Sequence, residues 1–114
     1  MISLESIKKL KTYLSHNSSL SESTIDDDIV YFDDKLGEWL TFYNDLNDAR
    51  KCVLIEMAFN HGIHGVIARK RLLHMISLGL YLVASQEIFN MKDTPTETEL
   101  RLSKMMKYGE WYEN

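Results

Sequence analysis

NDARKCVLIEMAFNHG, residues 47–62, is the stretch that decides the fold, because its middle is strongly apolar and both of its ends carry helix-capping residues. Asn47 and Asp48 are residue types that cap a helix N-terminus, and Gly62 is the type that most often follows the last turn. A strongly apolar helix must be surrounded by other elements. The stretch therefore predicts a buried helix over residues 49–60 that runs through the centre of the domain.

The rest of the chain also predicts helices. It contains one proline and five glycines, and it shows no alternating pattern typical of a strand. Apolar residues at helical spacing indicate further helices over about 3–14, 24–43, 66–78, 80–90 and 95–107. We expect a single all-α domain over residues 1–114, a bundle of about six helices. A serine-rich loop over 15–23 would separate the first helix from a helical lobe over 24–113.

Local signals predict where two of these helices begin. Ser23 would be the N-cap of the second helix, because Asp26 stands three residues later. The segment 94–97, TPTE, would start the last helix with Thr94 as N-cap and Glu97 closing a capping box. After that helix, Trp111 and its neighbour are expected to fold back onto the bundle.

Negative charge is concentrated in residues 22–48. This segment carries nine acidic residues against Lys35 alone, whereas the whole chain has a net charge of −4. Two interpretations are open: a solvated helix face whose first turn favours the helix dipole, or a surface that attracts a basic partner. The acidic residues of such a partner face would be Asp26, Asp27, Asp28, Asp33, Asp34 and Glu38.

Several other classes of site are disfavoured by the sequence. No apolar run is long enough for a membrane span, and residues 1–11 do not resemble a signal peptide, so we expect a cytoplasmic protein. Cys52 is the single cysteine and predicts a small buried core residue. The basic cluster 69–71 is too small to predict direct contact with nucleic acid. His61 and His64 flank a glycine in a turn, which is not a metal-binding spacing, and we expect no metal and no cofactor.

Two stretches resemble the phage-type lysozymes of glycoside hydrolase family 24. Residues 43–62, followed by Gly65 and Val66, resemble the central buried helix of that family, which ends in a Phe, an amide and a Gly at the floor of the substrate cleft. Residues 94–95 and 101–111 resemble its C-terminal signature, with Tyr108 in place of the family's threonine. The resemblance covers about residues 24–113 and implies the helical lobe of such a lysozyme.

The resemblance also implies that the catalytic lobe is missing. Active members carry a catalytic Glu at the end of the first helix, an Asp nine positions later and a Thr six beyond that, because cleavage of a glycosidic bond requires an acid and a second carboxylate. Here the first helix ends in LKTYL, residues 10–14, and no glutamate has an acidic residue nine positions later. The loop over 15–23 is too short for a β-lobe. The resemblance therefore implies a protein with no catalytic residues, which we expect not to be an enzyme.

Loss of the lobe would uncover the end of the central helix, and an exposed apolar patch usually binds a partner or a second copy of the chain. We therefore expect a protein-binding accessory factor of a phage or prophage, acting on a basic surface of a nucleic-acid-binding complex. An inhibitor of a host defence complex, an anti-CRISPR type of role, is its narrower form. Two alternatives stay open: peptidoglycan binding with residual muramidase activity, and a structural component of the virion. The residues of the uncovered face are Phe59, Asn60, His61, Gly62, Ile63 and His64.

Overall fold

Helices form every regular element of the part of the chain that the structure, a computed structural model, describes: residues 1–17 and 20–113. The predicted loop residues Ser18 and Ser19, and the last residue Asn114, lie outside the described residues. The predicted all-α fold is confirmed. In chain order the elements are α1 (Leu4–His16), α2 (Glu22–Trp39), the 3-10 turn η1 (Tyr43–Asp45), α3 (Asp48–His61), α4 (Ile63–Ile67), α5 (Lys70–Ser77), α6 (Tyr81–Phe89) and α7 (Glu97–Tyr108).

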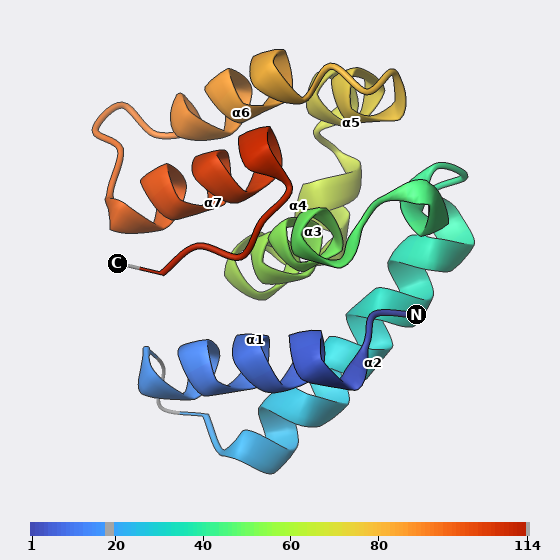
Figure 1. Cartoon of the computed structure of the whole chain (residues 1–114), viewed down its shortest axis with the longest axis vertical. Coiled ribbons are helices and arrows are strands. Elements are labelled where there is room, and N and C mark those ends of the chain that lie inside the picture. The colour runs from blue at the N-terminus through green and yellow to red at the C-terminus, as the bar shows by residue number, and fades with distance from the viewer. Residues whose placement is uncertain (18–19, 114) are drawn as a thin grey trace.

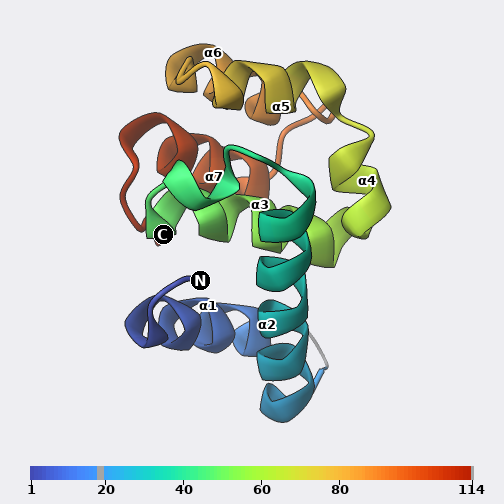
Figure 2. The same cartoon turned by 90° about the vertical axis from the view of Figure 1, so that its right-hand side faces the viewer.

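The central position of α3 follows from its sequence. Every residue from Lys51 to Ala58 is buried, so α3 has no solvated face over these two turns. The side chain of Asn47 caps it by accepting from the N–H of Arg50 at 3.0 Å, and Gly62 ends it with a φ of 77° that favours glycine. In Figures 1 and 2, α1 and α2 lie on one side of α3, whereas α5, α6 and α7 lie on the other.

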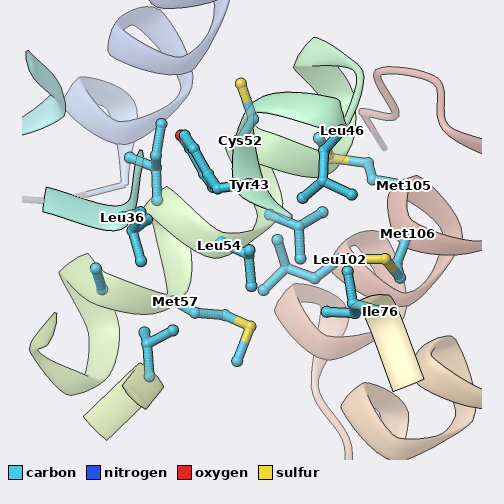
Figure 3. Close-up of a cluster of buried hydrophobic side chains, with 14 of the residues drawn as sticks. Leu36, Tyr43, Leu46, Cys52, Leu54, Met57, Ile76, Leu102, Met105 and Met106 are labelled. Atoms are coloured by element: carbon cyan, nitrogen blue, oxygen red, sulfur yellow. The ribbon is translucent and has the colours of Figure 1, made fainter. Parts of the chain in front are cut away.

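The core joins these two sides around α3. Leu54 and Met57 of α3 lie in the middle of the buried cluster, fully shielded from solvent (Figure 3). Side chains from α2, η1, α5 and α7 surround them and exclude water, which is the main stabilising contribution to a bundle of this size. The labelled neighbours are Leu36, Tyr43, Ile76, Leu102, Met105 and Met106.

Several predicted helix boundaries differ from the structure. The first helix extends to His16, and the second ends at Trp39 rather than at residue 43, because η1 turns the chain so that Tyr43 is buried. The predicted helix over 66–78 covers only the end of α4 and all of α5, because α4 already begins at Ile63, where a turn was predicted. Arg69 separates them, because its φ of −85° and ψ of 64° are not helical.

The predicted caps were wrong for two helices. Ser21, not Ser23, accepts from the backbone N–H of Thr24 and begins α2. The segment after Pro95 contains a second Thr-x-x-Glu pattern, and this one begins α7: Glu99 accepts from the N–H of Thr96 at 2.8 Å and from its hydroxyl at 2.6 Å. Glu99 also lies 3.5 Å from the ammonium of Lys92. These contacts hold the pKa of Glu99 below its usual range despite partial desolvation.

The C-terminal residues fold back as predicted. Trp111 and Tyr112 pack against the core, and the Arg101 guanidinium lies 5.9 Å from the Trp111 ring. Lys104 donates to the hydroxyl of Tyr112 at 3.0 Å. Within the described residues, no helix combines the length and the apolar character that crossing a membrane requires.

Candidate functional site

The acidic segment forms an exposed face on α2. Ile25, Ile29 and Leu36 turn inward and are fully buried, so the opposite side of the helix faces solvent. That side carries acidic residues at both ends and two apolar side chains, Val30 and Tyr31, which are 37% and 50% exposed. We call it the α2 outer face and define it as Asp27, Val30, Tyr31, Asp34 and Glu38.

The charges of the α2 outer face are largely unneutralised. Among residues 1–17 and 20–113, no basic side chain lies within ion-pair distance of Asp27 or Asp34. Glu38 lies 3.5 Å from Lys35, and both side chains are solvated, so the pair contributes little. Asp26 and Asp28 flank the face and are half-buried; Asp26 lies 3.8 Å from Lys11 of α1.

Asp33 does not belong to this face, contrary to the prediction. It is 4% exposed and accepts from the Tyr43 hydroxyl at 2.6 Å and from the backbone N–H of Ile2 at 3.2 Å. Burial and the bond to Asp33 both raise the pKa of Tyr43, so the hydroxyl stays protonated and donates. The carboxylate joins the N-terminus, α2 and η1, and its role is structural.

The predicted uncovered face lies where α3 meets α4, and it is only partly exposed. Ile63 is buried and is not available to a partner, contrary to the prediction. Phe59 is half-buried because its ring packs edge-on against Phe32 of α2, with centroids 5.1 Å apart. Asn60, His61, Gly62 and His64 are exposed.

This partly exposed region adjoins the end of α2. Trp39, which is 42% exposed, lies with its ring centroid 5.8 Å from that of His64. The Trp39–His64 and Phe32–Phe59 contacts both join α2 to the end of α3 and the start of α4. The predicted acidic face and the predicted uncovered face are therefore neighbours. On the other side of the same turn, partial burial and the nearby Arg69 and Lys92 lower the pKa of His61.

A hollow of about 280 Å³ lies between α1, α3 and α7. Its lining combines aromatic, amide and hydroxyl side chains with one carboxyl group, Glu56. The ring of Phe59 and the amide of Asn60 bring part of the predicted face into this hollow. The lining residues are Tyr13, Leu14, Asn17, Leu20, Ile25, Glu56, Phe59, Asn60 and Thr98.

Sequence reasoning missed the buried ion pair at the base of this hollow. The guanidinium of Arg101 donates to Glu56 Oε2, and both side chains are almost completely shielded from solvent. The Tyr13 ring lies 3.8 Å from the same guanidinium. Burial raises the pKa of Glu56, and the charge of Arg101 opposes that rise. The sequence did contain one indication of this ion pair. Glu56 interrupts the apolar run 52–58, and a buried carboxylate requires a partner.

The described residues give the hollow a single carboxyl group. Glu56 Oε1 is buried and has no hydrogen-bond partner among the described residues. Cleavage of a glycosidic bond requires a second carboxyl group about 5–10 Å away. Glu56 is the only carboxyl group among the described residues that line the hollow.

The described residues support neither of two other kinds of site, a nucleophilic cysteine and a metal centre. Cys52 is buried and burial raises the pKa of its thiol to about 12, so the thiolate that a nucleophile requires is not formed at neutral pH. In the described part of the chain, no three His, Cys, Asp or Glu side chains converge as metal ligands.

Comparison of the chain with protein-family models, with curated proteins and with solved structures finds no match.

Proposed function

We propose that this chain is a protein-binding accessory factor and that it binds a basic partner through the α2 outer face. One observation carries the proposal: Asp27 and Asp34 are exposed and form no ion pair with a described residue, and the exposed side chains of Val30 and Tyr31 lie between them. These apolar side chains add area from which a partner would exclude water. Tyrosine and tryptophan are the residues that most often supply binding energy at interfaces, and Trp39 lies at the end of the same helix.

Charge and apolar surface would have separate roles in this interface. The acidic residues attract a basic surface over a distance and suppress binding to acidic proteins. Tyr31 and Val30 supply the area that loses water on contact. The half-buried Phe32 behind them is held by Phe59, so the face is presented on a packed helix rather than on a loop.

In its narrower form, the proposal is a phage or prophage protein derived from the helical lobe of a family 24 lysozyme and without its catalysis. The resemblance of residues 43–62 and 101–111 supports the derivation, and the single carboxyl group of the hollow supports the loss of catalysis. An acidic helix face could occupy a surface that normally binds nucleic acid. An inhibitor of a host nucleic-acid-binding defence complex would have this property.

Charge reversal on the α2 outer face tests the proposal. The partner is captured from a lysate of the bacterial host with the tagged chain, identified by mass spectrometry and then titrated with purified variants. Asp27→Lys/Asp34→Lys is expected to weaken binding at least tenfold, because it replaces two attractive charges with two repulsive ones. Glu97→Lys/Glu110→Lys changes the net charge equally at exposed positions elsewhere and is expected to change binding less than twofold. Equal loss in both variants, or no loss in the first, would refute the proposed face.

Glycan binding in the hollow is a second candidate, favoured by the aromatic, amide and hydroxyl side chains that line it. Titration with soluble peptidoglycan fragments, followed by NMR, is expected to shift the signals of Asn17 and Thr98, which line the hollow. Asn60→Trp would fill the hollow, abolish those shifts and leave partner binding by α2 unchanged. If no fragment shifts these signals at millimolar concentration, or if Asn60→Trp binds as the unmodified chain does, the hollow is not a glycan site.

A further inference from the structure

A second surface, between α6 and α7, is chemically complementary to the α2 outer face. A hollow of about 280 Å³ runs between these helices. Leu82 and Phe89 of α6 and Leu100 and Tyr108 of α7 line it, and they are 53%, 38%, 37% and 61% exposed. Four large apolar side chains around one hollow form a patch of the kind that marks an interaction site. We call this surface the α6/α7 groove.

The polar rim of the α6/α7 groove is positive. Lys104 and Lys107 both line it, and no acidic residue does so among the described part of the chain. Neither lysine forms an ion pair with a described residue. Lys104 instead donates to the Tyr112 hydroxyl, and Lys107 lies 5.0 Å from the ring of Tyr108. The groove therefore favours an apolar segment that carries negative charge.

We propose that the α6/α7 groove binds the α2 outer face of a second copy of this chain. Residues 27, 31, 34 and 38 lie on one side of α2 at helical spacing, so they would face the groove together. Val30 and Tyr31 would contact the apolar lining. An α-helix rises about 1.5 Å per residue. Asp34 and Glu38 are therefore about 6 Å apart along the axis of α2, and Lys104 and Lys107 are about 4.5 Å apart along the axis of α7. These similar spacings would allow each carboxylate to face one ammonium group.

The two surfaces cannot meet within one molecule, so the contact joins different copies. In Figures 1 and 2, α2 and the α6–α7 pair lie on opposite sides of α3. A contact between two different surfaces is head to tail, and it leaves one α2 outer face and one groove free at the ends of each assembly. Self-association would therefore increase with concentration, and it would compete with the proposed partner for α2. The inference shares this face with the proposed function but does not depend on it.

A charge-swap series in sedimentation velocity tests the inference. The weight-average mass of the unmodified chain is expected to rise with concentration and to fall again at high salt, because salt screens exposed charges. Lys104→Glu/Lys107→Glu and Asp34→Lys/Glu38→Lys are each expected to weaken self-association at least tenfold, because each reverses one side of the proposed charge pairs. The chain with all four substitutions, or a mixture of the two double variants, is expected to recover it, because the swapped charges attract again. Lys8→Glu/Lys9→Glu is the matched control on the exposed side of α1 and should associate normally.

Several outcomes would overturn the inference. A mass independent of concentration, an unchanged association of the Lys104/Lys107 variant, or no recovery in the fourfold variant would each do so. The Lys104/Lys107 variant separates the two proposals, because it retains the α2 outer face and should still bind the partner. If the unmodified chain does not self-associate but the Asp27/Asp34 variant still loses partner binding, the proposed function is supported and the self-association is refuted.

Discussion

Arg101→Met is expected to lower the free energy of unfolding by about 3–5 kcal/mol, because it leaves a buried carboxylate without its partner. Glu56 is 2% exposed, and Arg101 is the only basic side chain that pairs with it among the described residues. The substitution also removes the guanidinium that lies against Tyr13. Urea denaturation of the purified variant, followed by circular dichroism, measures the loss.

A double variant distinguishes the buried charge from the lost packing. Glu56→Leu/Arg101→Met removes both charges and fills the site with apolar side chains, and such replacements are often neutral or stabilising. We expect it to recover most of the stability lost in Arg101→Met, with a strong coupling energy between the two positions. If Arg101→Met is as stable as the unmodified chain, the Glu56–Arg101 ion pair does not hold α3 and α7 together.

The stability lost in Arg101→Met should depend on pH. Burial raises the pKa of Glu56, and without the opposing charge of Arg101 it would rise further. A carboxyl group whose pKa is raised in the folded state contributes stability below its unfolded pKa, and this contribution is lost as pH rises through the folded value. The deficit of Arg101→Met should therefore be smallest below the ordinary pKa of a glutamate, about 4.3, and should grow as pH rises through the raised folded pKa of Glu56. The Leu/Met double variant should not show this added dependence.

Asp33→Ala is the second substitution with a large expected effect, although Asp33 lies in a row of acidic residues that looks solvated. It would leave the Tyr43 hydroxyl and the Ile2 N–H buried without acceptors, at a cost of about 1–3 kcal/mol for each group. Thermal unfolding of the variant measures the loss. Asp33→Asn, which retains one acceptor oxygen, should fall between the alanine variant and the unmodified chain.

The neighbouring residue is the control. Asp34 is exposed and unpaired, so Asp34→Ala should change stability by no more than about 0.5 kcal/mol. Equal effects at the two positions would contradict the buried role of Asp33. The difference also determines how binding is tested: reversing Asp33 together with its neighbours would unfold the chain, and the loss of binding would then say nothing about the α2 outer face.

Patterns confined to one helix were predictable. The apolar run 52–58 identified the buried helix, because every side of it had to be covered, and α3 is buried over these two turns. Asn47 and Gly62 identified its ends, because capping depends on residues next to each other in the chain. The same local reasoning chose the wrong one of two overlapping Thr-x-x-Glu patterns at 94–99. Lys92, which lies outside both patterns, contacts the glutamate of the second.

By itself, the sequence determined the helical class, the central helix and the acidic character of α2, because these follow from the spacing and type of residues within one segment. Only the tertiary structure decided which acid is solvated and which is part of the core. Asp33 is buried because its donors come from residues 2 and 43, and Glu56 is neutralised by a guanidinium 45 positions away. The charge that a carboxylate presents to solvent depends on the atoms that surround it after folding, and these come from other helices.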